Sequence, residues 1–191
     1  MSSSTEARPN SRERLLEAAA TLTYQDGVGI GIEALCKAAG VSKRSMYQLF
    51  DSKDELLAAS LERRAARLGQ LVIPPDDAEL PPRESILFVF ERVEAQALTP
   101  EYRGCPYLAA QIELKDTEHP ASQVARRVKQ GLEDFFRLQA ELGGAADPEF
   151  LGRQLILVFD GASARAGIRV DDLRGLATVT AAALLDAAGV R

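Results

Sequence analysis

The chain has 191 residues, 46% of them hydrophobic and 27% charged, and its net charge is -5. This composition is typical of a globular protein with one or two small domains. The apolar runs are far shorter than the ~20 residues that a membrane-spanning helix needs, so we expect a cytoplasmic protein without a membrane partner. Two cysteines, Cys36 and Cys105, are too few for a disulfide framework.

Charge is unevenly distributed along the chain. Residues 1–70 contain ten Lys or Arg and nine Asp or Glu, whereas the remainder contains 13 and 19. The segment 37–53 carries four basic residues against the single acidic Asp51. DNA binding needs positive charge at the contact surface rather than over the whole protein. The acidic total therefore does not exclude nucleic acid.

The predicted elements are all helical, because apolar residues recur at spacings of three and four and period-two β-branched runs are absent. Residues 1–10 are predicted to form a disordered, Ser-rich tail. A first helix follows, with Asn10 or Ser11 as its N-cap and an apolar stripe along one face. Gly27 is expected to end it with a left-handed backbone.

Three more helices complete the first part of the chain. The second spans 32–39, Gly40 permits a sharp turn, and the third spans 43–50. A capping box at the start of the fourth helix predicts that it spans 53–72. A Pro- and Asp-rich loop follows over 74–82. Further helices are predicted at 84–98, 105–115, 121–142, 148–166 and 171–188, which gives an all-α fold of about nine helices.

Residues 31–50 have the pattern of a helix-turn-helix, with a short helix, a glycine turn and a second helix that Ser42 caps. Helical spacing gives this second helix two faces. The predicted inward side chains are Met46, Leu49 and Phe50. The predicted outward side chains are Lys43, Arg44, Tyr47 and Gln48.

The outward face carries side chains of the kind that read DNA. Arg or Lys can bond guanine O6 and N7, and Gln can bond adenine N6 and N7. Hydroxyl groups suit phosphates, and a Lys in the first turn of the next helix can join that helix's free N–H groups on a phosphate. The predicted DNA contacts are Ser42, Lys43, Arg44, Ser45, Tyr47, Gln48 and Lys53. A charged outer face is often only solvated, so the pattern alone leaves both interpretations open.

The run AGVSKRSMYQLFDSKDELL resembles the helix-turn-helix signature of the TetR family of transcription regulators. The matching positions are Ala39, Gly40, Val41, Ser42, Tyr47, Phe50, Ser52, Lys53 and Leu56. A weaker resemblance covers GCPYLAAQIELKDTEHP, residues 104–120. Two positions depart from the family: Gly31 replaces a Thr at the start of the second helix, and Leu49 replaces a frequent His. Both departures predict weaker contacts with the DNA backbone.

The resemblance implies that residues 11–52 form the DNA-binding domain, that helix 53–72 links it, and that residues 73–191 form a ligand-binding and dimerisation domain. The helix 148–166 supports dimerisation, because it has two apolar stripes where a surface helix needs one. Burial of this helix within one chain remains the alternative. The predicted interface residues are Phe150, Leu151, Leu155, Val158, Phe159, Ala162, Leu173, Leu176, Thr180 and Leu184. The second of the two stripes contains Phe150 and also Leu157, Gly161 and Ala164, and this stripe needs a partner to cover it.

A ligand pocket in the C-terminal half is suggested by Phe88, Gln96, Tyr102, Cys105, Tyr107, Gln111 and Phe135. Aromatic residues at helical spacing are more often core, so that interpretation stays open for each of them. One His, His119, and one Cys, Cys105, are too few ligands for a metal site, and we expect neither a metal nor a cofactor. A redox role for Cys105 stays open.

These observations predict a homodimeric repressor that leaves a palindromic operator in double-stranded DNA when a small apolar or amphipathic ligand binds. An activator or a ligand-independent regulator with the same DNA-binding mode is the alternative. A helical enzyme or small-molecule carrier is more remote, because no titratable groups occur at catalytic spacing.

Overall fold

The computed structural model describes residues 10–170 and 172–191, and within them it contains nine α-helices, a short 3-10 helix and no strand. The all-α prediction is thus confirmed. Residues 1–9, predicted to form most of a tail, lie outside the described part. The elements are α1 (Ser11–Asp26), α2 (Ile32–Ala39), α3 (Lys43–Leu49), α4 (Lys53–Val72), η1 (Asp76–Ala78), α5 (Pro82–Ala97), α6 (Pro106–Leu114), α7 (Pro120–Leu142), α8 (Pro148–Gly167) and α9 (Leu176–Ala187).

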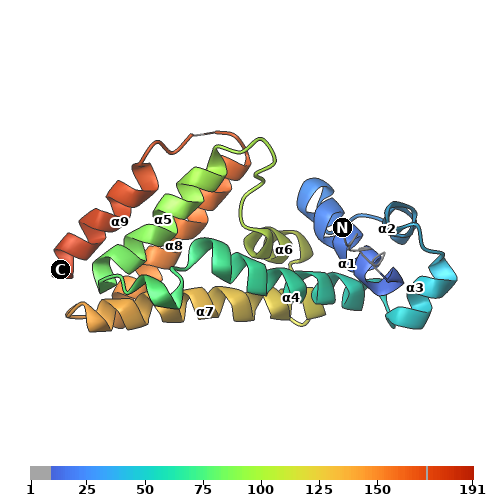
Figure 1. Ribbon diagram of the computed structural model, residues 1–191, viewed down its shortest axis with the longest axis horizontal. Helices are drawn as coiled ribbons and strands as arrows, with labels where there is room; N and C mark the ends of the chain where they lie inside the picture. Colours follow the sequence, from blue (N-terminus) through green and yellow to red (C-terminus); the bar gives the residue numbers. More distant parts are fainter. Residues whose placement is uncertain (1–9, 171) are drawn as a thin grey trace, which may run out of the picture.

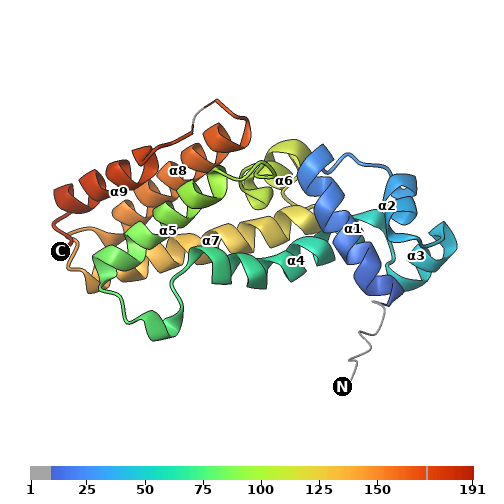
Figure 2. The same ribbon diagram turned by 45° about the horizontal axis from the view of Figure 1, so that its top comes forward.

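The molecule is elongated, with α1 to α3 at one end and α8, α9 and the C-terminus toward the other (Figure 1). Figure 2 shows that α4 and α7 run lengthwise between these ends. α4 packs against α1 on one side and against α7 on the other. α4 therefore belongs to both ends of the molecule.

Local chemistry sets the helix starts near the N-terminus. The side chains of Asn10, Ser42 and Ser52 each accept a hydrogen bond from the backbone N–H three residues ahead, at 2.9 to 3.0 Å. Gly40 has the left-handed backbone (φ 61, ψ 41) that the turn after α2 requires. Gly27 also has positive φ, but at φ 91 and ψ 169 it lies outside the left-handed helical region that we expected.

Two separate apolar cores hold these helices. A small one joins α1, α2, α3 and the start of α4. A larger one joins α4 to α9, with Phe90 stacked on Phe136 at 5.6 Å between ring centroids. Tyr107 is fully buried in the larger core, where its hydroxyl donates to the Leu61 carbonyl at 3.1 Å.

The last helix starts later than the sequence predicts. Leu173 and Arg174 have φ of 62 and 44, which a helix does not allow, so α9 begins at Leu176 instead of 171. Within the predicted loop 74–82, residues 76–78 form the 3-10 helix η1. In the part of the chain that the structure describes, no helix is long and apolar enough to cross a membrane.

Candidate nucleic-acid interface

α3 lies at one end of the molecule (Figure 1), and its outer face is polar. Met46 is fully buried beneath it, and Phe50 is buried immediately after the helix. Lys43, Arg44, Tyr47 and Gln48 are exposed, and Ser45 is half-buried beside them. The structure thus brings the predicted reading residues together on one accessible surface. Their contacts with DNA remain a prediction.

Leu49 does not lie where helical spacing predicted. Its side chain is 38% exposed, so its assignment to the inward face is wrong. α3 ends at Leu49, and Phe50 follows with extended backbone (φ -142, ψ 135). This change of direction places Phe50 in the core and leaves Leu49 at the surface. Sequence spacing failed because it assumed a helix that continued through Phe50.

Lys43 has an acidic partner that the sequence analysis missed. Its ammonium donates to the Glu33 carboxylate of α2 at 2.5 Å, although both side chains are largely exposed. This hydrogen bond raises the pKa of Lys43 and lowers the pKa of Glu33. Their separation of ten residues gives no helical pairing signal, because the turn at Gly40 brings them together.

Lys53 also has a partner within the chain. Its ammonium donates to the Val28 carbonyl at 3.0 Å and so joins the start of α4 to the loop between α1 and α2. In the same loop, the Val28 N–H donates to the Glu113 carboxylate of α6 at 2.8 Å. Gly31, the residue before α2, provides no side-chain cap, as its lack of a hydroxyl implies.

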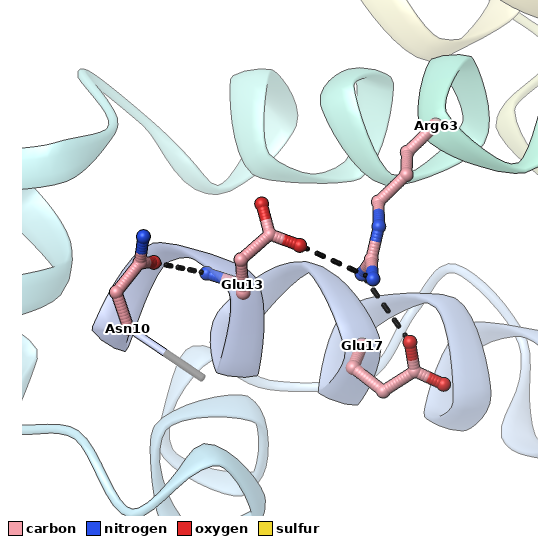
Figure 3. Close-up of polar contacts among 4 residues, drawn as sticks. All are labelled: Asn10, Glu13, Glu17 and Arg63. Carbon is pink, nitrogen blue, oxygen red and sulfur yellow. Dashed lines mark hydrogen bonds and ion pairs between the residues drawn. The ribbon is translucent and has the colours of Figure 1, made fainter. Parts of the chain in front are cut away.

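An ion-pair brace fixes α1 on α4 (Figure 3). Arg63 of α4 lies 3.1 Å from Glu13 and 3.2 Å from Glu17, which are one turn apart on α1. Exposed pairs of this kind contribute little stability individually, so they add to the apolar packing that already joins α1 and the start of α4. The sequence shows that the two glutamates share a face. It does not show which arginine they meet.

Tyr24 connects α1 to the segment before α6. Its hydroxyl accepts from the Arg103 N–H at 2.9 Å and donates to the Gly104 carbonyl at 3.1 Å. The Arg64 guanidinium of α4 lies 4.2 Å from the centre of the Tyr24 ring. These contacts connect α1, α4 and the segment before α6.

A cavity of about 300 Å³ lies among α4, α6, α7 and α8. Of the residues predicted for a ligand pocket, it brings together Cys105 and Tyr107. Burial raises the pKa of the Cys105 thiol, so the thiol is protonated at neutral pH. Both cysteines are free and buried. In the described parts of the chain, no three His, Cys, Asp or Glu side chains gather as a metal site would require.

The other predicted pocket residues lie elsewhere. Phe88 is covered by the Arg92 guanidinium at 5.8 Å, and Gln96 lines a different cavity of about 290 Å³ beside α1. Tyr102 is buried, and its burial raises its pKa to about 12. Phe135 packs against the larger core, and Gln111 is half-buried on α6. Neither residue lines the cavity that contains Cys105.

The predicted interface residues divide into two groups. The structure corrects the first group, whose side chains fill the core of the chain itself and offer no surface to a partner: Leu151, Leu155, Phe159, Ala162 and Leu173. Val158 and Leu184 are half-buried against the same core. Phe150, Leu176 and Thr180 are exposed, and their place in an interface remains a prediction. Leu157 and Val179, absent from the predicted list of interface residues, are 73% and 68% exposed.

Comparisons with known proteins agree with this geometry. A family model described as bacterial regulatory proteins of the TetR family matches residues 15–60. The crystal structure of a candidate TetR transcriptional regulator from Streptomyces avermitilis is 66% identical, with a TM-score of 0.94 over 96% of this chain and 100% of that one. An uncharacterized helix-turn-helix regulator of Mycobacterium tuberculosis is 36% identical over 76 residues, which span 39% of this chain and 38% of that relative.

A more distant structure shares the fold. It is the TetR-family regulator CifR, solved with a 26-bp operator DNA, which is 22% identical with a TM-score of 0.76 over 94% of this chain and 99% of that one. The capped α3 with its polar outer face and the family match define the class of this protein as a helix-turn-helix transcription regulator, not an enzyme. The chain belongs to the TetR family.

Proposed function

We propose that this protein is a homodimeric repressor that leaves a palindromic operator when a small apolar or amphipathic ligand binds its C-terminal domain. Residues 11–52 would read the operator, and residues 73–191 would bind the ligand and the second subunit. α4 would link these two domains. The observation that carries the proposal is the shared role of α4. It supplies Leu56 to the core beneath α3, and Gly69 and Val72 to the wall of the cavity.

Base reading is assigned to the exposed face of α3. Arg44 can bridge guanine O6 and N7, and Gln48 can bridge adenine N6 and N7. Tyr47 is well placed for a phosphate or a thymine methyl group. Lys53 is restrained by Val28, so it can contact a phosphate only near its present position. The exposed Leu49 adds apolar surface where relatives often have a histidine.

Dimerisation is supported by the apolar surface of α8 and α9. Phe150 and Leu157 on α8, with Leu176 and Val179 on α9, are exposed large side chains next to a completed core. Phe150 and Leu157 are seven residues apart and Leu176 and Val179 three apart, so each pair follows one face of its helix. Large exposed apolar surface marks interaction sites. A second copy of the chain is the partner that operator recognition requires, because one short helix contacts only a few base pairs. Two-fold pairing would place the recognition helices about 34–36 Å apart, or somewhat further, on successive major-groove turns.

The test is a selection of bound sequences from random duplex DNA with the full chain. The expected result is a palindrome whose half-sites change when Arg44 or Gln48 is replaced by Ala. A selected motif without two-fold symmetry would contradict the dimer. An unchanged motif with both variants would contradict the assignment of the reading face.

A further inference from the structure

Lys129 lies in the wall of the cavity among α4, α6, α7 and α8, and it forms an ion pair. The Lys129 ammonium of α7 bonds the Asp160 carboxylate of α8. The same ammonium lies 4.7 Å from the centre of the Phe159 ring. Among the described residues that line the cavity, Lys129 is the only charged one, and the remaining surface is mostly apolar. This ion pair has no part in the DNA-binding surface.

The charged hydrogen-bond donor of the cavity is the Lys129 ammonium. The Tyr107 hydroxyl donates its proton to the Leu61 carbonyl, so it can only accept from a ligand. The protonated Cys105 thiol is a weak donor. An ammonium has three N–H groups; one of those of Lys129 meets Asp160 and another can face the Phe159 ring. The Lys129 ammonium can therefore bond an acceptor oxygen of a ligand, through its third N–H group or in the place of Asp160.

The two ends of the ion pair differ in access to water. The Asp160 side chain is 26% exposed and the Lys129 side chain 12%. A displaced Asp160 carboxylate can therefore regain water by a small movement, whereas a displaced ammonium would leave its ring contact and the cavity wall. Burying an unpaired charge is costly, so a ligand that replaces Asp160 on Lys129 is favoured over one that replaces Lys129 on Asp160.

We propose that this cavity binds a small aromatic or alicyclic monocarboxylate, whose carboxylate takes the place of Asp160 on the Lys129 ammonium. A cavity of about 300 Å³ is at the small end of ligand sites, which suits one or two rings. The proposal rests on the proposed function, because it names the ligand class that would release the operator. Asp160 lies on α8, beside the exposed Leu157, so its release would loosen α8 from α7 next to the proposed dimer face.

The test compares three naphthalenes of matched shape, 2-naphthoate, 2-naphthamide and 2-(aminomethyl)naphthalene, by calorimetric titration of the full-length protein. We expect the carboxylate to bind about tenfold more tightly than the amide, because charge-assisted hydrogen bonds are about twice as strong as neutral ones. The amine should bind most weakly. Asp160→Asn should tighten naphthoate binding several-fold by removing its competitor.

Lys129→Met should abolish the preference for the carboxylate, while Lys115→Met, which removes an exposed lysine outside the cavity, should keep it. Lys129→Met/Asp160→Asn leaves neither charge unpaired, so it guards against misfolding, and it should also lose the preference. Failure of naphthoate to bind at millimolar concentration, equal binding of the amide, or a preference that survives Lys129→Met would overturn the proposal.

The proposed function is tested separately with the selected operator duplex. Binding of naphthoate through Lys129 without release of the duplex would support this site and contradict ligand-released repression. Release by another class of compound, without a Lys129-dependent preference for naphthoate, would support repression and overturn this site.

Discussion

Glu33→Gln is expected to strengthen binding to duplex DNA by releasing Lys43. Glu33 lies in the first turn of α2, its side chain is 80% exposed, and its carboxylate holds the Lys43 ammonium at 2.5 Å. The carboxylate thus occupies a basic group of the predicted reading face and also repels phosphates. Glutamine keeps the shape of the side chain and removes its charge.

The size of the effect follows from counterion release. Each phosphate that a protein neutralises adds about 0.9 to the slope of log K against log salt concentration. One freed Lys43 should therefore steepen the slope by about 0.9, so that a fourfold rise in salt weakens the variant about threefold more than the wild type. At low salt the variant should bind more tightly.

The assay is fluorescence anisotropy with a labelled duplex of mixed sequence over a series of salt concentrations. Glu84→Gln makes the same charge change at an exposed position on α5, and it should leave the slope unchanged. In a Lys43→Gln background, Glu33→Gln should have no further effect on the slope. If it strengthens binding equally with and without Lys43, the glutamate acts only at long range and the ion-pair reasoning is refuted.

Three further predictions concern assembly, the small core and the buried thiol. Leu157→Glu should give monomers in sedimentation analysis, whereas Ile112→Glu, at another exposed apolar position on α6 (59% against 73% for Leu157), should leave dimers; monomers or dimers for both would contradict the interface. Met46→Ala should lower the free energy of unfolding in urea by about 2–5 kcal/mol, while Tyr47→Ala should change it by less than about 0.5 kcal/mol. Because burial raises the pKa of Cys105, unfolding free energy should fall as the pH rises above about 8.5, where the unfolded thiol ionises. Cys105→Ala should reduce this fall, and an unaltered pH profile would assign it to other groups.

The parts of the fold that depend on neighbours in sequence could be predicted. The bounds of α2 and the caps at Asn10, Ser42 and Ser52 agree with the structure, because a cap is a bond between residues three apart. The prediction that Leu49 points inward failed, because Leu49 is the last residue of a helix of seven residues. The backbone leaves the helical path immediately after it. A spacing rule contains no information about where that path stops.

Partners that come from distant elements could not be predicted. Glu33 and Lys43 meet through a turn, and Lys53 meets Val28 through the packing of α4 on the loop after α1. The two apolar stripes of α8 show the same limit. Both satisfy the helical pattern, and the packing of α5, α7 and α9 against α8 decides that Leu155 is buried and Leu157 exposed.

The packing of α4 explains why a ligand among helices far from DNA could control its binding. Val72 and Ile73 line the cavity at one end of a helix of 20 residues, and Leu56 at the other end is fully buried in the small core that also contains Met46. Such a helix is about 30 Å long, and close-packed interiors transmit displacement rather than absorb it. A ligand that tilts α4 would therefore move α3. Both recognition helices of a dimer must match a fixed groove spacing. The same tilt in each subunit would change the distance between the two helices by twice the shift of one helix. By reciprocity, a dimer held on its operator would bind that ligand more weakly by the factor that the ligand weakens DNA binding.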